Sequence, residues 1–73
     1  MGITEDIADE LASEALAQEM RLDDEEIVKQ VSTILGATST TTQEAYLTAI
    51  RVRRAEQRAR KYLGDIAKRE PDA

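Results

Sequence analysis

The chain has 73 residues, a formal net charge of −5, and no Phe, Trp, Cys or His. Its length suits one small domain (1–73), and a domain of this size buries only about 60% of the surface that its unfolded chain exposes. The missing Cys and His residues exclude a disulfide framework and the usual zinc sites. Small domains without such links commonly gain stability by oligomerising, so a homodimer is the first expectation.

The same composition argues against an enzyme. Nucleophilic and acid–base catalysis rely mostly on His, Cys or closely placed carboxylates in a pocket. This chain has many carboxylates but few bulky apolar residues that could enclose a pocket. We therefore predict no catalytic residue, no metal site and no cofactor. The sequence also has no apolar run of membrane-spanning length and no signal-peptide pattern, so we expect a cytoplasmic protein.

Charge is distributed unevenly along the chain. Residues 1–35 carry ten acids and two bases, whereas residues 36–73 carry five acids and eight bases. Most of the bases lie in one block between residues 51 and 61. This asymmetry predicts either an electrostatic match between the two segments or two surfaces with different partners.

The first predicted element is an acidic helix that begins at residue 4. Its apolar residues recur at helical spacing from Ile7 to Leu16, and acids lie off that stripe. Residues 17–22 decide where this helix ends. They consist of good helix formers with no β-branched member, so propensity alone extends the helix to residue 21.

The second predicted helix covers residues 24–35. Asp23 stands three residues before Glu26, as in a capping box with Asp as the cap. Apolar residues then recur on one face as far as Leu35, and Gly36 is a typical left-handed stop after a helix.

A Ser/Thr run at residues 38–42 precedes the third predicted helix, which covers residues 42–68. Its apolar residues alternate between spacings of four and three, which is a heptad pattern with one polar position, Glu56. The residues of this seam are Ala45, Ala49, Val52, Glu56, Ala59, Leu63 and Ile66.

The predicted fold class is therefore all-α, as three helices in one domain. The helices are expected at about 4–16 or 4–21, at 24–35 and at 42–68. Along the chain, the domain divides into an acidic N-terminal helix (1–16), a helix-turn-helix core (17–62) and a C-terminal tail (63–73).

The order of short motifs in residues 17–62 resembles that of VapB-type antitoxins, which belong to the ribbon-helix-helix class of bacterial DNA-binding proteins. The resemblance consists of an Asp-Asp-Glu helix start, a Gly turn, a Thr-x-x-Glu-Ala segment that opens the next helix, and a basic pair within that helix. Here these motifs are Leu22-Asp23-Asp24-Glu25, Leu35-Gly36, Thr41-Thr42-Gln43-Glu44-Ala45 and Arg53-Arg54.

The resemblance implies a homodimer in which residues 17–22 form a strand. The strands of two copies would pair antiparallel and enter the major groove of operator DNA, as in transcription regulation by this class. Ala17, Glu19 and Arg21 would then face the bases. Arg21 suits guanine or a phosphate, and Glu19 can accept a hydrogen bond from cytosine.

The resemblance also implies a protein partner. The C-terminal part of such antitoxins wraps a PIN-domain ribonuclease toxin and covers its acidic, metal-binding active site. A basic amphipathic helix suits such a site in charge and in shape. The predicted partner contacts are Arg53, Arg54, Arg58, Arg60, Lys61, Tyr62 and Leu63.

Two other functions stay open on the sequence. The first is a purely helical dimer that acts as an adaptor or as a small subunit of a larger complex, which requires helix through residue 21 and no DNA binding. The second is an acidic inhibitor or DNA mimic that binds a basic protein through Glu10 and Glu14. Under a simpler interpretation, the basic block is a solvated face that pairs with the acidic first helix of the same chain or of a partner chain.

Overall fold

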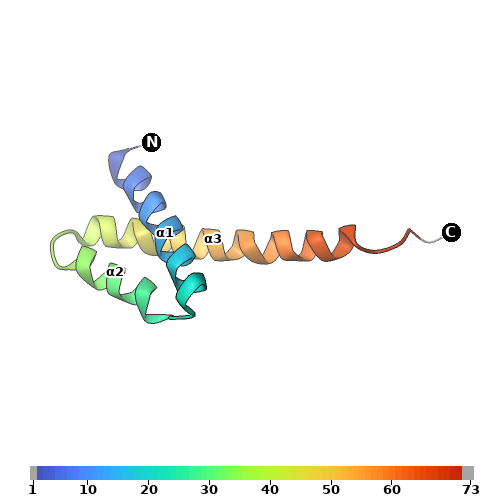
Figure 1. The fold of residues 1–73 in the computed structure, drawn as a ribbon. Coiled ribbons are helices and arrows are strands. Elements are labelled where there is room, and N and C mark those ends of the chain that lie inside the picture. The colour runs from blue at the N-terminus through green and yellow to red at the C-terminus, as the bar shows by residue number, and fades with distance from the viewer. Residues whose placement is uncertain (1, 72–73) are drawn as a thin grey trace.

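The structure is a computed structural model that describes residues 2–71. It contains three helices, α1 (Ile3–Leu22), α2 (Glu26–Gly36) and α3 (Thr40–Ala67). Helix α1 crosses the first half of α3, and α2 lies beside that half (Figure 1). The second half of α3 extends beyond the other two helices (Figure 1). The all-α prediction is therefore confirmed.

Helix α1 runs without a break through residues 17–22. The predicted extension to residue 21 is confirmed, whereas the strand at 17–22 and the helix end at residue 16 are wrong. The local physics favours the helix, since every residue of the segment ranks high for helix formation and Arg21 Nε donates to Gln18 Oε1 at 2.8 Å, one turn back. The helix ends at Asp23, which adopts the left-handed conformation with φ of 52°.

The turn into α2 differs from the predicted capping box. Asp23 closes α1, and the N-cap of α2 is Glu25, whose side chain makes no capping hydrogen bond. Asp24, one residue before it, accepts a hydrogen bond at Oδ1 from the backbone N–H of Glu26 at 3.0 Å. Helix α2 consequently begins at Glu26, two residues later than predicted.

Gly36 is the last residue of α2, and its φ is not positive. The predicted left-handed stop is therefore wrong. A different constraint suits glycine here, because a Cβ atom would collide with the side-chain amide of Gln43. That amide donates to the backbone carbonyl of Ser32 at 2.9 Å and so links the start of α3 to α2.

Helix α3 begins at Thr40, two residues earlier than predicted, because Ser39 provides its N-cap. The Ser39 hydroxyl accepts a hydrogen bond from the backbone N–H of Thr42 at 3.1 Å. The Ser/Thr run thus supplies the cap at its second residue, and its last three residues form the first turn of the helix.

The core is small and lies where the three helices meet. Alanines on α1 allow its backbone to approach α3 closely, and Tyr46 of α3 fills the centre with 0% of its surface exposed. The Tyr46 hydroxyl donates to the backbone carbonyl of Val28 at 2.9 Å, which ties α3 to α2. The buried residues are Ala8, Ala12, Ala15, Leu16, Val28, Tyr46 and Ile50.

Within residues 2–71, none of the helices combines the length and the apolar character that crossing a bilayer requires.

Candidate protein-binding surface

The second half of α3 has little contact with the rest of the domain. All residues from 55 to 65 are exposed, and we refer to residues 55–67 as the arm (Figure 1). Helices of about this length are marginal in water on their own. The arm is continuous with the packed half of α3, and two ion pairs between residues one turn apart stabilise it. Arg60 Nη2 lies 2.9 Å from Glu56 Oε2, and Lys61 Nζ lies 3.4 Å from Asp65 Oδ2.

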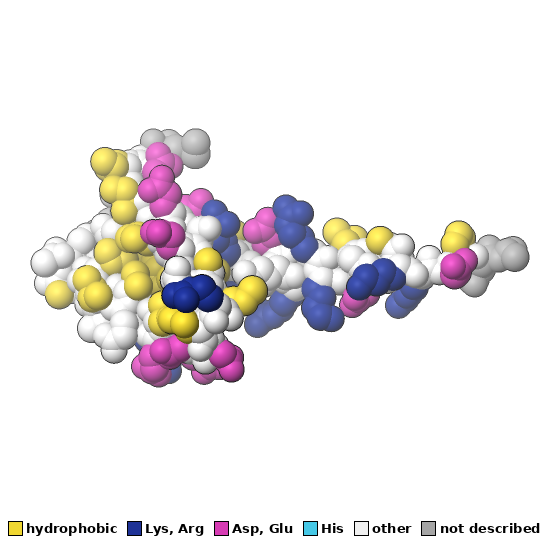
Figure 2. Space-filling view, viewed as in Figure 1, with side chains coloured by type: hydrophobic (Ala, Val, Ile, Leu, Met, Phe, Trp, Pro, Cys, Tyr) yellow, Lys and Arg dark blue, Asp and Glu magenta, His cyan; other side chains and the backbone are white. Residues whose placement is uncertain are grey.

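An apolar stripe follows the arm along one side. Its large side chains are mostly in solvent, with 62% of Val52, 63% of Tyr62 and 62% of Leu63 exposed. In Figure 2, apolar side chains lie along the upper edge of the outer part of the arm, and most of its basic side chains lie along the lower edge. The members of this apolar stripe are Val52, Ala55, Ala59, Tyr62, Leu63 and Ile66.

The apolar stripe lies on the opposite side of α3 from the core. Ala55 follows Tyr46 by nine residues, and Ala59 follows Ile50 by nine residues. Nine residues are about two and a half turns of an α-helix, so the members of each pair point in opposite directions. Since Tyr46 and Ile50 point into the core, the stripe points away from α1 and α2 of its own chain.

The predicted heptad seam therefore divides between two surfaces. Its first members, Ala45 and Ala49, are partly buried and pack against the core. Its later members, including Val52 and Leu63, belong to the exposed apolar stripe. The sequence pattern is continuous, but only its first part is covered within one chain.

Arg53 is tied to the acidic helix of the same chain. Its Nε donates to Asp9 Oδ1 at 2.8 Å and its Nη2 donates to Asp9 Oδ2 at 2.9 Å, which is the bidentate geometry of a guanidinium on a carboxylate. The hydrogen bond to Arg53 is the main reason that the pKa of Asp9 falls below its usual value. The same bond raises the pKa of Arg53.

Arg54 makes a second link to α1. Its Nη2 donates to both carboxylate oxygens of Glu19, at 3.3 and 3.0 Å. The two ion pairs join adjacent residues of α3 to two points of α1 that lie ten residues apart. Arg53 and Arg54, two of the seven predicted partner contacts, therefore bind α1 of the same chain.

We expect the Arg53–Asp9 pair to make stability depend on pH in acid. A carboxyl whose pKa is lowered on folding stabilises the fold above its unfolded pKa of about 4, and that contribution is lost as the pH falls through the folded pKa. Asp9→Asn should lower the urea midpoint at neutral pH slightly. Its difference from wild type should begin to shrink as the pH falls below about 4 and vanish below the lowered pKa of folded Asp9.

The check on this prediction is urea unfolding followed by circular dichroism at several pH values. Glu10→Gln is the matched control, because Glu10 lies on the same helix and has no ion pair among residues 2–71. A midpoint difference for Asp9→Asn that stays constant into strong acid would contradict the prediction.

The other predicted partner contacts lie on the arm. Arg58 and Arg60 flank the apolar stripe on its two sides, and Lys61 lies farther from it. Arg60 and Lys61 have acidic partners one turn away, whereas Arg58 has no ion pair within residues 2–71. Tyr62 and Leu63 belong to the stripe itself. The structure thus brings together the predicted contacts from residue 58 onward and separates them from Arg53 and Arg54.

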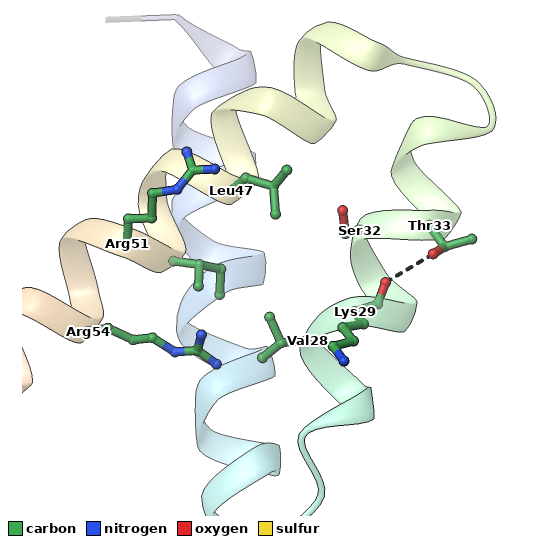
Figure 3. Close-up of a pocket in the computed structure, with 8 residues that line it drawn as sticks. Val28, Lys29, Ser32, Thr33, Leu47, Arg51 and Arg54 are labelled. Carbon is green, nitrogen blue, oxygen red and sulfur yellow. Dashed lines mark hydrogen bonds between the residues drawn. The ribbon is translucent and has the colours of Figure 1, made fainter.

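A groove of about 410 Å³ lies between α2 and α3 (Figure 3). Its apolar part is formed by Val28, Leu47 and Ile50, and its cations are Lys29, Arg51 and Arg54. Both hydroxyl groups of α2 in this groove already make hydrogen bonds within the chain. Thr33 donates to the backbone carbonyl of Lys29 at 3.1 Å, and Gln43 donates to Ser32 Oγ at 3.3 Å.

The predicted DNA contacts are on α1, not on a ribbon. The Glu19 carboxylate binds Arg54, and Arg21 binds Gln18. These contacts stabilise the helix and its crossing with α3, so neither side chain is presented on a strand.

Of the stripe, sequence reasoning named only Tyr62 and Leu63 as partner contacts. Periodicity identified Val52, Ala59 and Ile66, but it could not tell which part of the seam the chain covers by itself.

Within residues 2–71, no group of three or more acidic side chains is arranged to hold a metal ion. No family model, curated protein or solved structure matches the chain in comparisons with known proteins.

Proposed function

We propose that this chain is a small helical protein-binding subunit that uses its arm to bind an acidic partner protein. The observation that carries the proposal is the apolar stripe, which is exposed and points away from the core of its own chain. Monomeric soluble proteins rarely expose contiguous apolar surface of this kind without a partner. Tyr and Arg, which are enriched in binding hot spots, both occur here.

In its most specific form, the proposed function is that of an antitoxin. The arm would lie in the acidic active site of a PIN-domain ribonuclease, with Tyr62 and Leu63 as apolar anchors and Arg58 and Arg60 facing carboxylates. Charge complementarity of this kind speeds association and selects the partner. An amphipathic helix in a groove is a common mode of protein recognition.

Operator DNA is not among the proposed partners. Residues 17–22 would have to pair as a ribbon to enter a groove of DNA, and they belong to α1. The helical adaptor or small subunit of a larger complex is the second candidate, and the unbroken α1 favours it. It differs from the antitoxin only in what the partner does.

The test compares Leu63→Asp with Gly64→Asp. Both variants add one negative charge on the same turn of the arm, but residue 64 lies off the apolar stripe and a Cβ atom there has no neighbour within 4 Å. We expect Leu63→Asp to weaken partner binding about 30-fold or more, as loss of a hot-spot residue does. Gly64→Asp should have little effect.

Partners are captured from an extract of the source cells on the immobilised wild-type chain. Each captured protein is then purified, and its affinity for wild type, Leu63→Asp and Gly64→Asp is measured by calorimetry. A partner that binds the Leu63→Asp chain as tightly as wild type would overturn the proposed function. If the partner cleaves RNA, inhibition by wild type and not by Leu63→Asp identifies an antitoxin, and a partner without ribonuclease activity identifies an adaptor.

A further inference from the structure

The free end of α1 has a second exposed apolar face. Ile3 is 75% exposed and Ile7 is 42% exposed. Ala12 follows Ile3 by nine residues and Leu16 follows Ile7 by nine residues, so these pairs also point in opposite directions. Since Ala12 and Leu16 are in the core, this outer face of α1 points away from α3.

Acidic side chains accompany the outer face of α1. Glu10 lies one turn beyond Ile7, and Glu14 lies one turn beyond Glu10. Figure 2 shows apolar and acidic side chains side by side on the free end of this helix. A shallow hollow of about 370 Å³ beside them is lined by Asp9, Glu10, Ser13, Glu14 and Arg53.

The contacts within one chain leave opposite charges on these two exposed faces. Asp9 and Glu19 of α1 are taken by Arg53 and Arg54. Glu10 and Glu14 have no ion pair within residues 2–71. On α3, Arg58 has no ion pair within residues 2–71, whereas Arg60, on the other side of the apolar stripe, pairs with Glu56 of the same helix. One free face is therefore apolar and acidic, and the other is apolar and basic.

The two faces cannot meet within one chain. The outer face of α1 points away from α3, and the apolar stripe of α3 points away from α1, so each lies on the far side of the crossing from the other. We propose that they meet between two copies, and that the arm of one chain packs on the outer face of α1 of a second chain. The inference rests on the proposed function in so far as the arm is a protein-binding element.

The lengths and areas are compatible with such a dimer. The stripe from residue 52 to residue 66 is about 21 Å long and the outer face from residue 3 to residue 14 is about 17 Å long, at 1.5 Å per residue. A stable interface buries about 800 Å² of each partner, about one seventh of the 5848 Å² accessible surface of this chain. A two-fold dimer forms the arm–α1 contact twice, which doubles the area that one pair of helices supplies.

This pairing gives the free protein a masked binding surface. A second copy covers the apolar stripe until a partner with higher affinity displaces it. Partner binding and self-association then compete for the same residues, so the dimer dissociates when the partner binds.

The test measures self-association by sedimentation equilibrium. The double variant Glu10→Lys/Glu14→Lys reverses the charge of the outer face, and we expect it to weaken the dimer about tenfold or more, since like charges then face each other. The control, Glu25→Lys/Glu44→Lys, makes the same change in net charge at exposed positions elsewhere. It should leave the dimer intact.

A charge swap completes the test. Adding Arg58→Glu/Arg60→Glu to the chain with Lys at positions 10 and 14 should restore most of the lost affinity, because the pairing is re-formed with opposite signs. A wild-type chain that stays monomeric at all concentrations overturns the inference. A dimer that is weakened by Leu63→Asp but not by Glu10→Lys/Glu14→Lys also overturns it, because the arms then pair with each other.

Failure of this inference is distinguishable from failure of the proposed function. The Glu10→Lys/Glu14→Lys chain has an unaltered arm, so it should bind the partner protein at least as tightly as wild type does. A chain that dimerises through α1 but binds no partner contradicts the proposed function alone. A chain that binds a partner but never dimerises contradicts the inference alone.

Discussion

Tyr46→Ala is expected to remove a large part of the stability of the chain and to lower its urea midpoint strongly. Tyr46 is fully buried where the three helices meet, and its hydroxyl is bonded to the backbone of α2. Replacing a buried aromatic side chain by Ala costs about 3–5 kcal/mol. A chain of this length has a total stability of about 4–11 kcal/mol at 0.05–0.15 kcal/mol per residue, so this one change removes a large part of it.

Tyr62→Ala is the matched control for Tyr46→Ala. It makes the same substitution on the same helix, at a residue that is 63% exposed. Its effect on the free energy of unfolding should be within about 0.5 kcal/mol. Urea unfolding followed by circular dichroism measures both variants. Similar midpoints for Tyr46→Ala and Tyr62→Ala would contradict the core described here.

Ala12→Leu is expected to have the next largest effect. Ala12 is 0% exposed at the crossing of α1 and α3, so a larger side chain has to push the two helices apart. Overpacking of this kind costs about 1–3 kcal/mol. The separation also strains the Arg53–Asp9 and Arg54–Glu19 pairs, whose geometry depends on the crossing.

Ala17→Leu is the control for Ala12→Leu, because it adds the same atoms at an exposed position of the same helix. We expect it to be nearly neutral in urea unfolding. A neutral Ala12→Leu would mean that α1 does not pack closely on α3, and the assignment of the two exposed faces would then fail with it.

The helices could be predicted from the sequence because their signals are local. Spacing of apolar residues located all three, and the absence of β-branched residues in 17–22 favoured the helix that the structure has there. The strand came from the family resemblance, whose motifs are capping residues that also occur between ordinary helices. The boundaries moved by one or two residues because neighbouring Asp, Ser and Thr residues compete for each cap.

The crossing of α1 over α3 could not be predicted from the sequence. Periodicity identifies an apolar face, but it does not say which helix covers it. The pairs Arg53–Asp9 and Arg54–Glu19 join residues 44 and 35 positions apart, and no local pattern links them. The charge asymmetry of the two halves predicted either a match between them or two surfaces with different partners, and only the structure divides the charges into those paired between α1 and α3 and those left exposed.

We expect the apolar stripe of the arm to contact a second protein molecule. This expectation is tested most directly by placing a photo-crosslinking amino acid at position 62 or at position 64 in the source cells. Both positions are exposed and lie on the same turn, but only Tyr62 belongs to the stripe. We expect discrete cross-linked products from position 62, with the mass of a partner protein or of a second copy of the chain added, and little or none from position 64. No product, or equal products from both positions, would contradict it.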